Sequence, residues 1–253
     1  MIFLWTKNKK QPTKNTCSFE SLYIRAMSEK KKVHLPEISQ ERVLRVELAN
    51  ALIHGFGVLF ALASIPVVTA IAASIQNIPA IVAAAIYSFS FTMLFLFSTL
   101  YHAVQNPTAK KMLKVCDHIS IYFLIAGTYT PLILIYLFNG FGIALLSILW
   151  GLALVGIIFK IFSAGKYKLF STLLYLAMGW ILIVGGKTFF TTVPLDVMIM
   201  IVIGGLLYSF GAIFYMSKRL VWHHVIWHAF VLAAAICHYV AVLLGVLHSP
   251  GSV

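Results

Sequence analysis

The sequence predicts an all-α integral membrane protein, a seven-transmembrane helix bundle with its N-terminus in the cytosol and its C-terminus outside. Three observations lead to this prediction. First, 61% of the residues are hydrophobic and only 10% are charged, against about 45–50% and about 25% in soluble domains. Second, the apolar residues form seven long stretches. Third, Lys and Arg alternate between the segments that join these stretches. A soluble chain this apolar would expose patches that promote aggregation.

The seven stretches are long enough to cross a bilayer, because a core of about 30 Å requires about 20 apolar residues in a helix. They cover residues 46–74, 80–102, 117–138, 142–163, 169–186, 197–217 and 222–247. Turn-forming pairs such as Asn106-Pro107 and Asn139-Gly140 separate them. The fifth stretch is the shortest and ends in Gly185-Gly186. Pro131 is predicted to kink the third helix, since proline removes a backbone donor.

Basic residues predict the orientation. Ten of the 19 Lys and Arg residues lie in the first 45 residues, and the second, fourth and sixth loops carry most of the others. The first and third loops and the C-terminal tail carry none, and the fifth carries only Lys187, beside Asp196. Because cytosolic loops are enriched in Lys and Arg, this alternation requires an odd number of spans. We expect a multi-pass protein of the cell (plasma) membrane.

The chain divides into a basic cytosolic N-terminal tail, residues 1–45, and a seven-helix membrane domain, residues 46–253. Met27 opens the segment MSEKKKV and is a candidate natural start, which would place residues 1–26 outside the native protein. The net charge of +12 is scattered and forms no single basic face, which excludes nucleic acid as a partner. Membrane lipids are the expected partners, with anionic lipid headgroups at the tail. Cys17, Cys116 and Cys237 are too far apart for a disulfide framework or a CxxC metal site.

Polar residues within the spans are few, and each needs a reason, because an ionisable group in hydrocarbon costs at least a few kcal/mol. On the predicted topology five of them, from four helices, fall in one layer at the cytosolic end of the bundle: Glu47, His102, Asp117, His224 and His228. The set comprises Glu47, Asn50, His54, Ser98, His102, Asp117, His118, His224, His228 and His238.

A zinc site is the chemistry that this layer favours. His224 and His228 are four residues apart on one helical face, and His102 lies at the same depth on another helix. Three histidines leave a fourth position on zinc for water, whose pKa then falls to about 7. The segment HVIWH lacks the glutamate of HExxH. We therefore expect Asp117 to hold or deprotonate the water, and Ser98 to orient water or a substrate oxygen.

Other interpretations remain open for these residues. The whole cluster is also consistent with a hydrogen-bonded network that holds the helices together. Glu47, Asn50 and His54 are consistent with a polar helix start at the interface or with a substrate cavity. His238 lies about 15 Å along the helix from His228, too far to share the ion. It is expected to be a buried hydrogen-bonded residue or to line a cavity, and His118, about 100° from Asp117 around its helix, is expected at the interface.

Four segments carry a resemblance to a known family. ELANALIHGFG, FSTLYH, DHISIYFLIAGTYTP and HHVIWHAFVLAAAICHY resemble the hemolysin III proteins of bacteria, which belong with the progestin and adipoQ receptor (PAQR) family and are related to alkaline ceramidases. The resemblance runs from about residue 42 to 247. It implies a seven-helix bundle with the N-terminus in the cytosol and a zinc ion held by His102, His224 and His228. It also implies that Asp117 contacts the zinc through water and that Ser98 is the serine of an SxxxH motif.

The residues and the resemblance together predict a zinc-dependent hydrolase of a lipid acyl amide or ester, ceramidase-like and active in membrane lipid homeostasis. The bundle cavity would take the acyl chain. One alternative is a non-enzymatic membrane sensor or receptor-like protein with structural zinc. Another is cytolysin (hemolysin-type) activity, which is disfavoured because the chain has many spans and is expected to lack a secretion signal.

Overall fold

The computed structural model describes residues 40–163, 167–217 and 219–249. Their elements are α2 (Gln40–Ile75), α3 (Ile78–Ala103), α4 (Pro107–Tyr136), α5 (Gly140–Ser163), α6 (Lys168–Gly179), the short 3-10 helix η1 (Ile181–Gly185), α7 (Gly186–Thr192), α8 (Leu195–Met216) and α9 (His223–Leu247). Within these residues there is no strand, and seven helical segments are long and apolar enough to cross a membrane. The predicted fold class, an all-α bundle of seven membrane-spanning segments, is confirmed. Residues 1–39 of the predicted tail lie outside the described residues.

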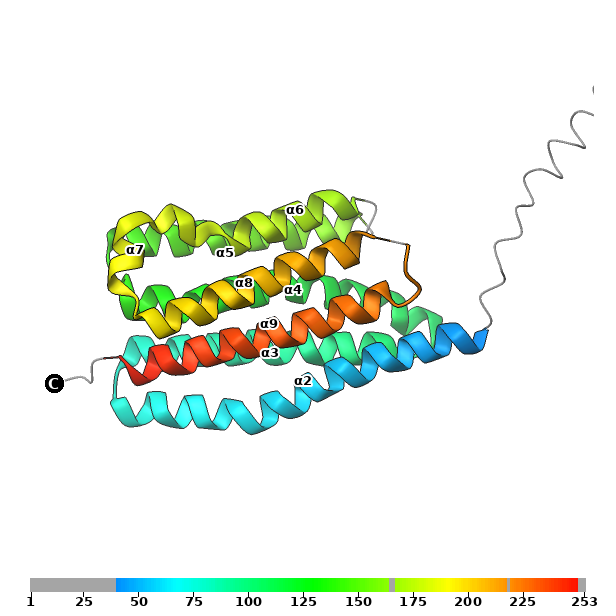
Figure 1. Cartoon of the computed structure of the whole chain (residues 1–253), viewed down its shortest axis with the longest axis horizontal. Coiled ribbons are helices and arrows are strands. Elements are labelled where there is room, and N and C mark those ends of the chain that lie inside the picture. The colour runs from blue at the N-terminus through cyan, green and yellow to red at the C-terminus, as the bar shows by residue number, and fades with distance from the viewer. Residues whose placement is uncertain (1–39, 164–166, 218, 250–253) are drawn as a thin grey trace, which may run out of the picture. The chain divides into compact units, whose positions relative to one another are not determined.

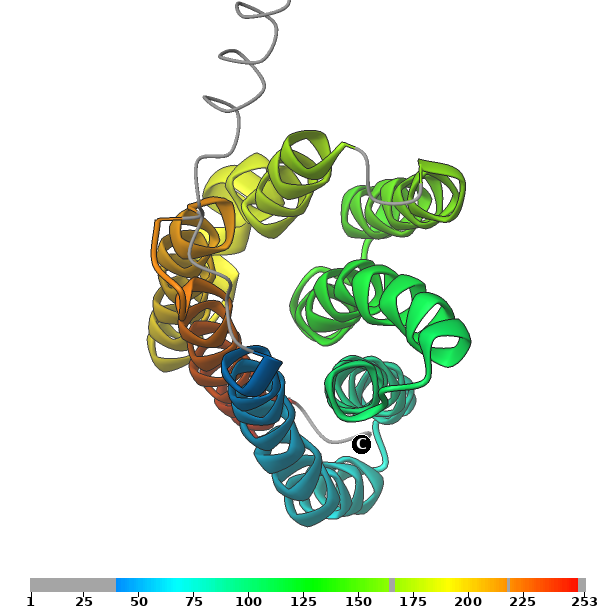
Figure 2. The same cartoon turned by 90° about the vertical axis from the view of Figure 1, so that its right-hand side faces the viewer.

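The helices run side by side along the bundle (Figure 1). Viewed along the helices, α8 and α9 lie on one side and α3, α4 and α5 on the other (Figure 2). Their outer faces expose large apolar side chains, and Leu59, Leu154 and Phe210 are more than half exposed. In water such a surface would aggregate, whereas in a bilayer lipid chains cover it. The protein is therefore a multi-pass membrane protein that contacts lipids.

The helix starts follow local capping. The Asn106 side chain accepts hydrogen bonds from the backbone N–H groups of Thr108 and Ala109, and Pro107 occupies the first helical position of α4. The prediction that the third span begins at residue 117 is therefore wrong. Hydropathy overlooks the polar first turns that the cap holds in place, so Asp117 lies in the third turn of α4 and not at its start.

The fifth crossing is broken into α6, η1 and α7, and it extends past the predicted end at residue 186 to Thr192. The break frees the Gly179 carbonyl, which accepts a hydrogen bond from the Tyr129 hydroxyl. Non-helical backbone at membrane depth is tolerated where protein covers it or where it lines a cavity. Gly179 and Trp180 do line a cavity, so the break belongs to the interior of the bundle.

Glycines allow close helix contacts, which matter in lipid because apolar burial alone does not drive helices together. A Cβ at Gly57 of α2 would lie 2.1 Å from Cδ1 of Phe95 on α3. Gly204 and Gly211 of α8 similarly face α9, against His238 and Phe230. These contacts lie within one chain.

Gly57→Ala is expected to destabilise the protein by about 1–3 kcal/mol, because the added methyl group overpacks the contact with Phe95. The Phe95 side chain is fully buried. The measurement is thermal unfolding of the detergent-purified full chain, followed by helical circular dichroism. Gly151→Ala is the matched control: nothing lies within 4 Å of its added Cβ, and alanine favours helix over glycine. Equal melting temperatures for the two variants would contradict tight packing at Gly57.

Candidate metal centre

Three histidines meet at the end of the bundle where α3 ends and α9 begins, called here the triad end. The ligand nitrogens of His102, His224 and His228 all lie within 4.8 Å of one another. Nε2 of His102 is 3.0 Å from Nε2 of His228. His102 and His228 are buried, and His224 is half-buried. The four-residue spacing on α9 brings His224 and His228 onto one face, with ring centroids 4.5 Å apart.

Glu47 fixes the protonation of His102. Its Oε2 is 3.2 Å from Nδ1 of His102 and accepts a second hydrogen bond, of 2.6 Å, from Nζ of Lys110. A carboxylate only accepts hydrogen bonds, so Nδ1 of His102 donates to Glu47, and in the neutral form of the ring Nε2 presents a lone pair. Carboxylates hold metal-ligating histidines in this way.

The donor set fits a metal ion. The lone pair on Nε2 of His102 points at Nε2 of His228, and Nδ1 of His228 is buried without a hydrogen bond to any described residue. A tetrahedral zinc ion places its ligand nitrogens about 3.3 Å apart. The 3.0 Å contact is close to that value, and His224 lies within reach of the same centre. The triad can therefore bind a metal ion, and three nitrogen ligands leave a coordination position for water or substrate.

Asp117 and Ser98 lie beside the triad. The Asp117 side chain lines the same cavity as His224 and His228 and is only 13% exposed. The Ser98 hydroxyl is fully buried next to Asp117, but it is not in hydrogen-bond geometry with any described residue. His118 also lines the cavity, and its Nδ1 donates to the Lys114 carbonyl at 2.5 Å. His118, which was predicted at the interface, therefore also belongs to the cavity lining.

The polar residues of α2 separate into different surroundings. Glu47 contacts His102, as described above. His54 is 2% exposed, lies with its ring centroid 4.0 Å from that of His228, and lines the cavity. Neither ring nitrogen of His54 bonds a described residue, and the buried Oδ1 of Asn50 is likewise unpartnered among them.

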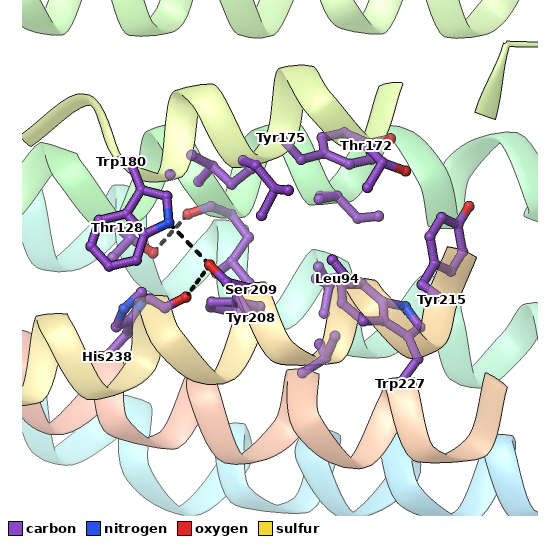
Figure 3. A pocket seen from close by; sticks show the side chains of 18 of the residues that line it. Leu94, Thr128, Thr172, Tyr175, Trp180, Tyr208, Ser209, Tyr215, Trp227 and His238 are labelled. Carbon is purple, nitrogen blue, oxygen red and sulfur yellow. Dashed lines mark hydrogen bonds between the residues drawn. The ribbon is translucent and has the colours of Figure 1, made fainter. Parts of the chain in front are cut away.

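One apolar cavity of about 110 Å³ extends from the triad end into the bundle. His54, Asp117, His224 and His228 line one part of it, and aliphatic and aromatic side chains line most of the remainder. Figure 3 shows Tyr215 and Thr172 toward one end and Trp180 and His238 toward the other, with Leu94 between them.

The part of the cavity away from the triad contains polar groups that the sequence analysis mostly missed. His238 was expected to be hydrogen-bonded or to line a cavity, and it does both: it lines the cavity, and its Nε2 lies 3.2 Å from the Ile201 carbonyl. Trp180, Tyr208 and Ser209 also line this region. No sequence signal distinguished them from ordinary residues of apolar helices.

Comparisons with known proteins agree with the predicted resemblance. A model of the family described as "Haemolysin-III related" matches residues 43–239. The chain is 40% identical over 204 residues to "Hemolysin-3" of Bacillus cereus, covering 81% of this chain and 93% of that protein. It is also 40% identical over 207 residues to the "Hemolysin-3 homolog" of Bacillus subtilis (strain 168), covering 82% and 97%.

A human protein shows a more distant similarity. The chain is 30% identical over 171 residues to the "Monocyte to macrophage differentiation factor" of Homo sapiens, covering 65% of this chain and 71% of that protein. The chain therefore belongs to the haemolysin-III related family, within the progestin and adipoQ receptor superfamily.

Proposed function

We propose that the protein is a zinc-dependent hydrolase that cleaves a lipid acyl amide or ester within the membrane and so controls membrane lipid composition. The observation that carries this proposal is the meeting of His102, His224 and His228 at an apolar cavity that also contains Asp117. A metal centre on the wall of an apolar cavity matches a substrate with one reactive carbonyl and a long chain.

Each group would have a distinct role in the proposed hydrolysis. Zinc, when bound to the triad, supplies a Lewis acid for the carbonyl and a nucleophilic water near neutral pH. Asp117 would accept the proton of that water as its oxygen adds to the carbonyl carbon, and would pass it to the leaving amine or alcohol. The C–N or C–O bond then breaks to give a fatty acid. Ser98 and His54 have unpartnered polar atoms near this point and would hydrogen-bond the water or the carbonyl oxygen.

We also propose that the triad end faces the cytosol of a cell whose plasma membrane holds the protein. Most of the described basic residues of the joining segments gather there, among them Lys110 and Lys114 near the start of α4 and Lys168 at the start of α6, whereas Lys187 lies at the other end. Cytosolic segments favour such residues. The basic residues 1–45 would then meet anionic headgroups of the inner leaflet.

The test of the proposed activity uses the full chain in lipid nanodiscs with long-chain N-acyl amines and acyl glycerols as substrates. Fatty acid release is measured by mass spectrometry before chelation, after chelation and after zinc is added back. We expect release that disappears with chelation and returns with zinc. If the folded, zinc-supplied protein released no fatty acid from any of these lipids, the hydrolase would be rejected.

A structural metal is the second candidate, favoured by the contacts of His102. This residue of α3 bonds Glu47 of α2 and lies against His228 of α9, so an ion at the triad would tie three helices together in a sensor or receptor-like protein. Cytolytic activity is the third candidate, suggested by the names of the Bacillus relatives. Its test is leakage of liposomes to which the purified chain is added from outside.

Glu47→Gln is expected to weaken zinc binding about tenfold, because a neutral amide holds the Nδ1 proton of His102 less firmly and makes the ring a weaker ligand. The measurement is competition for zinc against a fluorescent chelator. Glu41→Gln is the matched control, since Glu41 lies on the same helix but pairs with exposed Arg45. Unchanged affinity in the Glu47 variant would identify Glu47 as a polar helix-start residue.

A further inference from the structure

A second polar group lies in the cavity at a distance from the triad. It is called here the far cluster and consists of Trp180, Tyr208, Ser209 and His238 (Figure 3). These residues come from the break after α6, from α8 and from α9. His238 follows His228 by ten residues on one helix, so the far cluster lies about 15 Å from the triad along α9.

Part of the far cluster is already hydrogen-bonded. Trp180 Nε1 donates to Ser209 Oγ at 3.0 Å, and Ser209 Oγ donates to the Gly205 carbonyl at 2.8 Å. Nε2 of His238 lies 3.2 Å from the Ile201 carbonyl. Because a carbonyl oxygen only accepts, Nε2 carries the proton, and Nδ1 of the neutral ring presents a lone pair.

The remaining part lacks partners. The Tyr208 hydroxyl is buried and bonds no described residue, while its ring centroid is 5.4 Å from that of His238. A polar group that is buried without a partner is costly. Gly204 leaves room for the ring of His238, because a Cβ at this position would lie 2.2 Å from Cδ2 of His238.

The Tyr208 hydroxyl is one available donor and Nδ1 of His238 is one available acceptor, on rings whose centroids lie 5.4 Å apart, and such a pair matches a hydroxyl group. A hydroxyl can accept from Tyr208 and donate to Nδ1 of His238 at the same time. A methyl chain end would leave both groups unpaired. A carboxylate would find no Lys or Arg among the residues that line the cavity.

We infer that the far cluster is a subsite for a hydroxyl group carried near the distal end of a lipid acyl chain whose carbonyl carbon lies at the triad. This inference rests on the proposed function and narrows its substrate class to acyl chains with a distal hydroxyl. The apolar wall between the two polar ends then fixes where along the chain the hydroxyl must lie.

The test is a competition among three fatty acids, which are products of the proposed hydrolysis. The full chain in nanodiscs is incubated with equal amounts of dodecanoic acid, whose extended length matches the separation of the two polar groups, its ω-hydroxy derivative and its α-hydroxy derivative. Retained acids are counted by mass spectrometry and corrected with empty nanodiscs. We expect the ω-hydroxy acid to be enriched about tenfold over the other two.

Tyr208→Phe removes only the unpartnered oxygen and is expected to lower the enrichment to near one without weakening retention of dodecanoic acid. Tyr167→Phe is the matched control, because Tyr167 is 60% exposed and does not line the cavity. Equal retention of the three acids, equal enrichment of both hydroxy acids, enrichment that survives in Tyr208→Phe, or no retention above empty nanodiscs would each overturn the inference.

Retention is measured without turnover, so the inference and the proposed function can fail separately. If hydrolysis is absent while the ω-hydroxy acid is enriched, the hydrolase is wrong and the subsite stands. If lipids are hydrolysed but the three acids are retained equally, the subsite is wrong and the hydrolase stands.

Discussion

Replacing His102, His224 and His228 together with alanine is expected to reduce bound zinc from about one ion per chain to near zero. The three ligand atoms lie within 4.8 Å of one another, and the described residues bring no second group of this kind together. The measurement is elemental mass spectrometry of the detergent-purified full chain after zinc has been supplied and excess removed. Helical circular dichroism of the same samples establishes that the variant is folded.

The adjacent histidine pair on α9 provides the control for this experiment. His223 and His224 are neighbours in sequence, but only His224 belongs to the triad, so His223→Ala is expected to retain zinc. If the folded wild-type chain bound no metal after zinc was supplied, the triad would be a hydrogen-bonded network between helices and not a metal site. Zinc retained in the triple variant would place the metal elsewhere.

Asp117→Asn is expected to lower lipid hydrolysis by about 10²–10⁴-fold, the usual contribution of a general base, while zinc content stays unchanged. Asparagine keeps the shape of the side chain but cannot accept the proton of the attacking water. Fatty acid release and zinc content are measured on the same preparation, because a catalytic role separates the two and a ligand role does not.

Asp196→Asn is the control for a change of charge alone, since Asp196 begins α8 and is about half exposed. Loss of zinc together with activity in Asp117→Asn would make Asp117 part of the metal-binding set. If Asp117→Asn bound zinc and hydrolysed lipid as fast as the wild type, Asp117 would have no role in catalysis.

The fold could be predicted because the physics that determines it acts on single segments. A helix that crosses a bilayer must be apolar over about 20 residues whatever its neighbours are, so composition alone located seven segments. Helix starts were less predictable. The capped, polar first turns of α4 from Pro107 carry Lys110 and Lys111, and an apolar window cannot detect them.

Two sequence features made the triad predictable. His224 and His228 are four residues apart, and His102 was expected at the same depth in the membrane as these two residues. The contact between Glu47 and His102 depends on how α2 meets α3 and on side-chain conformations, neither of which is encoded in spacing. The far cluster was even harder to predict from the sequence. Trp180 enters it through a break in the fifth crossing, and breaks of this kind depend on tertiary contacts such as the one between Tyr129 and Gly179.

The position of Glu47 has a thermodynamic consequence. One of its oxygens holds both Nδ1 of His102 and Nζ of Lys110, and Lys110 is about a quarter exposed at the start of α4. An anion that draws Lys110 away changes the charge that His102 experiences, and so changes the free energy of metal binding. Linkage is reciprocal: the factor by which such an anion alters metal affinity equals the factor by which the metal alters affinity for the anion. A metal ion at the triad and an anion at Lys110 would thereby be coupled through a single carboxylate.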